Sequence, residues 1–402
     1  RGTSPHVLDD GAKVVSEDVE RVLAESYQDA RIATNTPEGV QRVLRESYQV
    51  YTIGFNYGQK HIVELDRAQQ NIEYLKKSGY VVEHKTVDLS SIMSMFTGSL
   101  TSGEKIPEGH YEQDQMKSTV VPHRNAIFAS IIYGYALSKS NQHSSDVSIS
   151  LGVHSGDHAI YPDCRPEFYQ VLNHAFTIGN WDSEKVHLEL PYIDGDKISI
   201  LQDALISCEQ LSIDFDIVFA NTNTSYEPDE HGRSSGKTGS DIERILAFHA
   251  IGRKDPVEYQ ESWESTLQHA LKIEHEHMDK IYREKLTNLQ YQVTRNSATE
   301  RAFTGIYDKH FESGTYYCIC CGHPLFESTG KYNSGCGWPA FHSEHNSASI
   351  ARIEDYTHGM IRIEVRCSKC DAHLGHVFND GPREHGGERY CINSASIEFR
   401  ES

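Results

Sequence analysis

The sequence predicts a multidomain protein in which an α/β domain, with a parallel sheet flanked by helices, precedes a smaller cysteine-rich domain. Three observations support this fold class. The chain has 402 residues, strand-like and helical segments alternate as far as Tyr259, and most cysteines lie in the last quarter. At roughly 100 to 200 residues per domain, this length gives two or three domains with ample cores.

The composition limits the classes of function to consider. Lys and Arg total 38 against 58 Asp and Glu, so the formal net charge is −20 and phosphate-rich partners would be repelled. We therefore expect no nucleic-acid partner. No apolar run approaches the roughly 20 residues that span a bilayer, so we expect a soluble protein without membrane insertion. The chain begins with Arg1, which leaves a removed tag, signal or organellar presequence open.

The first element expected along the chain is a short tandem repeat. Residues 17–28 (EDVERVLAESYQ) and 38–49 (EGVQRVLRESYQ) each have the spacing of a short amphipathic helix. Two copies are too few to stack as a solenoid, so a local duplication is favoured. We assign residues 1–29 to an N-terminal extension and residues 30–258 to the α/β domain.

Strands and helices then alternate in the manner of βαβ units. Residues 30–34 (ARIAT) and 50–55 (VYTIGF) are strand-like, and their alternation with helices implies a mainly parallel sheet. A long helical segment without Gly or Pro follows, so residues 259–285 are expected to connect this domain to the last one, residues 286–402. The other expected elements are helices over 62–79, 125–139 and 166–179 and strands at 80–83, 147–152 and 185–189.

Two CxxC pairs in the last domain predict a zinc site. Cys318 with Cys321, and Cys367 with Cys370, can each present two thiolates from one tight turn, and four thiolates complete a tetrahedral shell. Because all four positions are filled by protein, one structural zinc is expected; the alternative is that some of these are buried free thiols. Cys320 should point away from the metal. Clustered cysteines also indicate a reducing compartment, cytoplasmic or organellar (mitochondrion or plastid).

Two further cysteines suggest redox chemistry. Cys391 lies in the strand-like run GERYCINSASIEF, and histidines and Arg389 nearby are expected to depress its pKa, as a nucleophile needs. Cys336 lies in NSGCGWPAF, whose glycines favour a flexible turn suited to a resolving thiol.

These residues carry a resemblance to the methionine-R-sulfoxide reductases. The matching motifs, from Leu286 to the end, are LTNLQYQVTRNSATERAFTGIY, the two CxxC pairs, SGCGWPAF, HGMIRIEVRC, DAHLGHVFNDGP and RYCINSASIEF. The resemblance implies a mainly β distorted barrel of two antiparallel sheets, with zinc opposite the active site. It also implies methionine-sulfoxide-containing proteins as substrates and a Cys336–Cys391 disulfide that thioredoxin reduces.

The same resemblance implies a role for each site residue. Cys391 attacks the sulfoxide sulfur and becomes a sulfenic acid, and Trp338 receives the substrate methyl group. The residues that bind and protonate the sulfoxide oxygen are His373 and His376, helped by Asp380, Arg389 and Asn393.

The first domain, over residues 30–259, resembles the 7-cyano-7-deazaguanine synthases. The motifs that carry this are FNYGQKHIVEL, VVPHRNAIFAS, LGVHSGDHAIYPDCRPEF, GDKISIL and SSGKTGSDIERILAF. The resemblance implies the adenine-nucleotide α-hydrolase fold. It leaves open whether a base-like ligand still binds at Gly156, Asp157, Tyr161, Asp163, Cys164 and Arg165.

Two departures from this second family argue against synthase activity. Where the family has its ATP loop, SGGxDS, this chain reads ARIATNTPEGVQRV, without the glycines that close on pyrophosphate, so no ATP is expected. The family's four zinc cysteines are replaced by Ser225, Ser235, Thr238 and Asp241. We thus expect an inactive first domain joined to a thioredoxin-dependent reductase for oxidative-stress repair. The alternative is an accessory subunit of a larger, perhaps organellar, assembly that keeps enzyme folds as scaffold.

Overall fold

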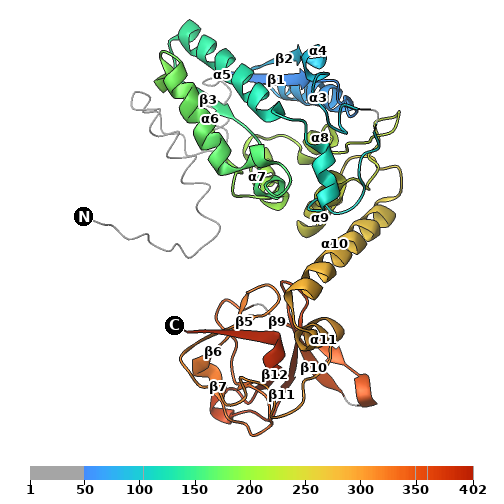
Figure 1. Cartoon of the computed structure of the whole chain (residues 1–402), viewed down its shortest axis with the longest axis vertical. Helices are drawn as coiled ribbons and strands as arrows, with labels where there is room; N and C mark the ends of the chain where they lie inside the picture. The colour runs from blue at the N-terminus through green and yellow to red at the C-terminus, as the bar shows by residue number, and fades with distance from the viewer. Residues whose placement is uncertain (1–48, 103, 349, 360, 402) are drawn as a thin grey trace, which may run out of the picture. The chain divides into compact units, whose positions relative to one another are not determined.

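The computed structural model describes residues 49–102, 104–348, 350–359 and 361–401 (Figure 1). The expected strand at 30–34, the place of the ATP loop and nearly all of the tandem repeat lie outside these described residues. The chain divides into two compact units, Arg1–Leu271 and Lys272–Ser402, and each is described by itself. No helix among the described residues is long and apolar enough to cross a membrane.

The first unit contains parallel strand pairs joined by helices, which confirms the expected α/β class. β1 (Val50–Asn56) pairs in parallel with β2 (Val82–Asp88), and α3 (Val63–Lys77) connects them. β3 (Val147–Ser150) pairs in parallel with β4 (Val186–Glu189). In the part of the chain that the structure describes, these are two separate two-stranded sheets.

Helices cover the strands of this unit. α5 (Arg124–His143) and α6 (Pro166–Gly179) lie side by side (Figure 1), with the rings of Tyr133 and Phe176 stacked at 4.6 Å. Pro166 suits the first position of α6, because a backbone N–H there has no intrahelical acceptor and its loss breaks no hydrogen bond. The structure also describes the α-helices α4 (Ser90–Met93), α7 (Lys197–Gln210), α8 (Phe215–Ala220) and α9 (Gly239–Ala250) in this unit.

The second unit is built from two antiparallel sheets. α10 (Trp263–Lys285) occupies the expected connecting stretch, and α11 (Asn288–Asn296) follows, capped by the Thr287 side chain. The strand orders are β7-β8-β12-β11-β10-β9 and β13-β5-β6. The strands are β5 (Gly314–Cys318), β6 (Pro324–Glu327), β7 (Lys331–Tyr332), β8 (Ala340–Phe341), β9 (Ile350–Asp355), β10 (Arg362–Cys367), β11 (His373–Phe378), β12 (Arg389–Ile392) and β13 (Ile397–Glu401).

The expected barrel is not closed. Within the described residues no ladder joins the two sheets, so each keeps its own edge strands, β7 and β9 in one and β13 and β6 in the other. β7 and β8 are two residues long, too short to carry pairing from one sheet to the other. The expectation of two antiparallel sheets is therefore confirmed, but these sheets do not close into a barrel.

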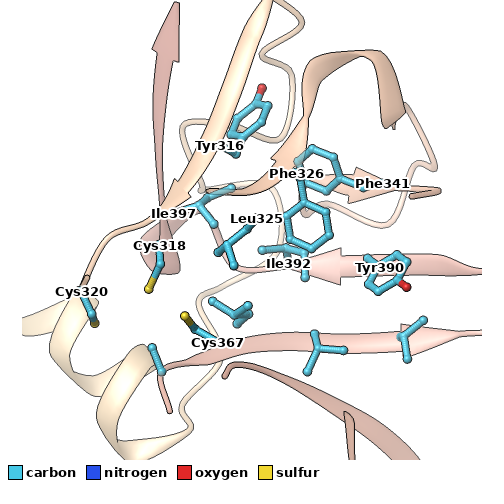
Figure 2. Packing of buried hydrophobic residues seen from close by; sticks show 14 of the residues in the cluster. Tyr316, Cys318, Cys320, Leu325, Phe326, Phe341, Cys367, Tyr390, Ile392 and Ile397 are labelled. Atoms are coloured by element: carbon cyan, nitrogen blue, oxygen red, sulfur yellow. The ribbon is translucent and has the colours of Figure 1, made fainter. Parts of the chain in front are cut away.

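The core of the second unit lies between these sheets. Figure 2 shows Phe326 against Phe341, whose rings stack at 4.4 Å, with Ile392 beside them. All three side chains are fully buried. Cys318 and Cys367 continue the same core at its end, so the cysteine cluster is continuous with the apolar packing (Figure 2).

Candidate functional site

Four cysteines from two tight turns converge at one end of this core. Cys318 and Cys321 lie at the end of β5, Cys367 and Cys370 at the end of β10, and their sulfur atoms all lie within 4.8 Å of one another. Both turns share one hydrogen-bond pattern. The backbone carbonyl of the first cysteine in each pair accepts from the amide four residues later at 2.8 Å. The backbone amide of the same cysteine donates to the carbonyl five residues later, at 2.8 Å in the first turn and 2.9 Å in the second.

A second pair of sulfur atoms lies in the six-stranded sheet. The Sγ atoms of Cys336 and Cys391 are 3.6 Å apart. Cys391 is held in β12, opposite His376 on β11 and Ala340 on β8, so its backbone is fixed by strands on both sides. Cys336 lies in a loop with Gly337 at a φ of 89°, a conformation that favours glycine. The fixed thiol and the loop thiol are thus close enough to form a disulfide after a small movement.

The electrostatics of the pair differ from the sequence-based expectation. Burial, and after it the neighbouring Cys336, raises the pKa of the Cys391 thiol to about 12, against the opposing effect of the Arg389 guanidinium. Burial also acts to raise the pKa of Cys336, yet hydrogen bonds, led by that of the Ser334 hydroxyl, bring it below its usual value. Two close thiols favour one negative charge between them, and in this geometry it falls on Cys336.

Two histidines lie on β11 near Cys391, each paired with an acid from another strand of the same sheet. The Nδ1 atom of buried His373 pairs with the carboxylate of Glu364 on β10. The Nε2 atom of His376 lies 2.9 Å from Oδ2 of Asp355 on β9. Burial lowers the pKa of His373, against the opposing effect of Glu364.

The predicted residues Arg389 and Asp380 bind each other. The guanidinium of Arg389 donates to both carboxylate oxygens of Asp380, at 2.8 and 2.9 Å, and lies over the ring of Phe378. A bidentate pair of this kind fixes the orientation of the guanidinium. Asp380 therefore orients Arg389 rather than an imidazole.

Glu300 connects two further predicted residues through its backbone. Its carbonyl accepts from the Trp338 indole at 3.1 Å, and its amide donates to Oδ1 of Asn393 at 3.0 Å. Its buried carboxylate accepts from the amides of Ser394 and Ala395. The Asn393 amide group also donates to a carbonyl of β11 at 3.0 Å, so both ends of this side chain are engaged by backbone.

In the first unit, the predicted base-pocket residues lie within a polar cluster. Tyr111 donates to Oδ1 of Asp157 at 2.7 Å, and the hydroxyls of Tyr161 and Tyr226 lie 3.5 Å apart. Burial raises the pKa of Cys164 to about 12, so this thiol stays protonated. Three other predicted residues, Gly156, Asp163 and Arg165, lie in the same stretch before α6.

The four positions that replace the second family's cysteines come together around one carboxylate. Oδ2 of Asp241 accepts from the hydroxyls of Ser225 at 3.0 Å, Ser235 at 2.8 Å and Thr238 at 2.9 Å. It also accepts from two backbone amides of the loop, at 3.1 and 3.3 Å. Asp241 is buried, and Thr238 and Asp241 form the capping box of α9. We call these four residues the Asp241 cluster.

Residues 286–401 match the SelR domain family. The chain is 54% identical over 121 residues to "Peptide methionine sulfoxide reductase MsrB" of Burkholderia cenocepacia (strain HI2424), which covers 30% of this chain and 85% of the relative. The protein of the same name from Hahella chejuensis is 53% identical over 124 residues, covering 31% and 88%. The chain belongs to the MsrB family. This membership supports methionine sulfoxide reduction by the second unit, hereafter the MsrB domain.

A second match covers just over half of the chain. Residues 40–252 match "Queuosine biosynthesis protein QueC", so the first unit contains a QueC domain and the chain belongs to that family as well. Both sequence-based resemblances, and their order along the chain, are thereby confirmed.

The MsrB domain fits a single structural zinc at its four cysteines. Four convergent thiolates suit tetrahedral Zn²⁺ and leave no open coordination position. Arg295 and Lys285 donate to the carbonyls of Cys370 and Cys320, at 2.8 and 2.7 Å, which places positive charge beside the thiolates. Cys320 falls outside the set of four sulfurs.

The residues of the Asp241 cluster do not fit the zinc of the QueC family. Three hydroxyls and one carboxylate cannot replace four thiolates around Zn²⁺, which favours softer donors. All three hydroxyls already donate to Oδ2 of Asp241, whereas Oδ1 of this carboxylate is buried without a hydrogen-bond partner among the described residues. Hydrogen bonds here tie together the loop segments that a metal would otherwise hold.

Sequence reasoning missed three acids of the MsrB domain. Asp355 and Glu364 pair with the two histidines across strands, and Glu300 holds Trp338 and Asn393. Glu364 lies in the strand-like run IRIEVRC, whose alternation of side chains could have marked it as a site residue. In the structure its side chain lies on β10 and is 12% exposed. No comparable pattern marks Asp355 or Glu300.

Proposed function

We propose that the MsrB domain reduces the R epimer of methionine sulfoxide through a sulfenic acid and a disulfide. The observation that carries this is the 3.6 Å separation of the Cys336 and Cys391 sulfurs beside two acid-paired histidines. Cys391 attacks the sulfoxide sulfur as its proton passes to the Cys336 thiolate, and His376 gives a proton to the oxygen. The oxygen ends on Cys391 as a sulfenic acid, and methionine leaves with its sulfur reduced.

The second step regenerates the thiol. The thiolate of Cys336 attacks the sulfenic sulfur, and hydroxide leaves as water when it takes a proton, so a Cys336–Cys391 disulfide forms. Thioredoxin supplies the two electrons that reduce this disulfide. Protein-bound methionine sulfoxide is the proposed substrate.

The other site residues bind the substrate or position the groups that react with it. Trp338 receives the substrate methyl group, while Arg389 adds positive charge and His373 adds a hydrogen bond at the sulfoxide oxygen. Asp380 orients Arg389, and Asn393 positions the end of β12 through its backbone hydrogen bonds. Zinc at the four cysteines stabilises the fold and takes no part in the reaction.

We propose further that the QueC domain has no synthase activity. Its zinc positions carry the Asp241 cluster, and the sequence lacks the family's ATP loop. An accessory subunit of a larger assembly is the competing function for the whole chain. The close approach of Cys336 and Cys391 favours an enzyme, because a scaffold has no need to keep two thiols together.

The test is turnover of the two sulfoxide epimers of an N-acetylmethionine ester with dithiothreitol. The R epimer should be reduced and the S epimer left intact. Cys391→Ser should abolish the reaction, since a hydroxyl lacks the nucleophilicity of a thiolate. Cys336→Ser should release one equivalent of methionine per chain and then fail with thioredoxin. Equal rates for both epimers would contradict the proposal.

A further inference from the structure

An exposed aromatic side chain borders the redox pair without being used by the reaction described above. Phe303 lies in the loop between α11 and β5, and 66% of its surface is exposed. Ile306 in the same loop is 77% exposed. An aromatic ring of this size gains free energy when it is buried, so its exposure next to a reaction centre needs an explanation.

The backbone conformation of Phe303 is one that a phenylalanine rarely adopts. Its φ is 64°, in the left-handed region where side chains with a Cβ atom are strained and bulky ones are outliers. Its amide donates to the carbonyl of Gly337 at 2.7 Å, which holds this conformation in place. Glycine or asparagine would adopt the same backbone with less strain. The local fold therefore does not account for a phenylalanine, and strain of this kind is concentrated at functional sites.

The ring lies beside the loop that carries the resolving cysteine. A Cβ atom added to Gly337 would meet Cδ2 of Phe303 at 3.0 Å, so the ring edge packs close to this glycine. Gly337 separates Cys336 from Trp338, and the Cys336 sulfur is 3.6 Å from that of Cys391. In an extended polypeptide each residue advances the chain by about 3.5 Å. A residue next to a methionine bound at Cys391 therefore lies within reach of Phe303.

We propose that Phe303 is a specificity-determining residue that binds the side chain flanking the oxidised methionine, with a preference for apolar flanks. This inference rests on the proposed reductase function. The ring supplies rigid apolar surface at the edge of the site and makes no contact with the sulfoxide itself. It should therefore affect the binding of polypeptide substrates and leave the chemical steps unchanged.

The experiment compares three substrates of the full chain with dithiothreitol as the reductant. Two are capped pentapeptides with central methionine-R-sulfoxide, flanked either by leucines or by aspartates, and the third is the N-acetylmethionine sulfoxide ester without flanking residues. Phe303→Gly should raise KM for the leucine peptide by about tenfold, the effect of losing one aromatic contact. The values of kcat, and KM for the aspartate peptide and the ester, should stay the same.

Stability measurements separate binding from a structural role. Phe303→Gly should melt at the same or a higher temperature, because glycine relieves the left-handed strain. Phe303→Asn, which tolerates this backbone and lacks the ring, should behave in the same way. Phe311→Ala, which removes another exposed aromatic of the MsrB domain, should leave KM for all three substrates unchanged.

Three results would overturn the inference. An unchanged KM for the leucine peptide would exclude the contact, and a lower melting temperature with loss of ester reduction would make Phe303 structural. A defect confined to thioredoxin-driven turnover would assign the ring to the reductant. If the unmodified chain fails to reduce even the ester, the reductase proposal itself has failed, which is a distinct outcome.

Discussion

At the reaction centre, each histidine is oriented by an acid from another strand of the same sheet. Asp355 binds His376 and is itself held by the Arg362 guanidinium at 2.6 Å and by Thr357. The hydrogen bonds from Thr357 come first among the interactions that keep the pKa of Asp355 well below its usual range. This carboxylate is thus ionised wherever the enzyme works, and it can fix the imidazole at any such pH.

Replacement of Asp355 tests this orienting role. Asp355→Asn should lower kcat by on the order of tenfold to a hundredfold with little change in KM, because the imidazole loses its charged partner while the substrate pocket is kept. Steady-state kinetics on the R-sulfoxide ester measure the split. Glu398→Gln, which removes an exposed acid paired with Arg400, is the control. A rise in KM alone would contradict the role.

The two thiols give a second test at this scale. Cys336 raises the pKa of Cys391, so Cys336→Ser should lower that pKa and increase the thiolate fraction of Cys391 at any pH below it. The rate of alkylation by iodoacetamide, followed against pH and assigned by mass analysis, should rise at lower pH in the variant. Cys208→Ser, in the other unit, should leave the profile of Cys391 unchanged. An unchanged profile, or a shift to higher pH, in Cys336→Ser would contradict the electrostatic coupling.

At the scale of elements, residue spacing in the sequence predicted the helices and turns that depend on residues close together in the chain. The helix expected over 166–179 coincides with α6, and the four cysteines of the CxxC pairs converge as their turns require. Cross-strand partners such as Asp355 and His376 depend on strand order, which one sequence does not contain. The pKa of Cys391 is raised, whereas the sequence predicted a lowered one, because burial of the thiol depends on how the sheet packs.

The Asp241 cluster is an element held by hydrogen bonds alone, and its removal should be costly. Asp241→Ala leaves buried hydroxyls and amides without their acceptor, so the QueC domain should lose about 3 kcal/mol of stability. Asp241→Asn keeps one oxygen acceptor and should lose less. Urea unfolding of the full chain measures both, with Asp216→Ala, at an exposed ion pair with Arg253, as the control. Metal analysis should still find one zinc per chain; two would contradict the assignment.

For the whole molecule, the two units should respond differently to removal of metal. Structural zinc contributes on the order of 10 kcal/mol in small domains, so a chelator, or Cys367→Ser, should abolish the melting transition of the MsrB domain. The QueC domain should melt at the same temperature as before, because the Asp241 cluster needs no metal. Calorimetry of the full chain resolves the two transitions. A chelator that shifts both would contradict this division.

Because the two sheets do not close into a barrel, loss of zinc from the four cysteines should have a further consequence. The four cysteines that would hold it come from the end of β5 in one sheet and the end of β10 in the other, so a zinc bound there would join two sheets that share no ladder among the described residues. Without it, the sheets can separate and present unpaired strand edges and the apolar faces between them to other chains. Exposed edges of this kind template intermolecular strand pairing. Metal-depleted protein should therefore scatter light and sediment as aggregates before it behaves as an unfolded monomer, so that loss of zinc is a loss of colloidal stability as well.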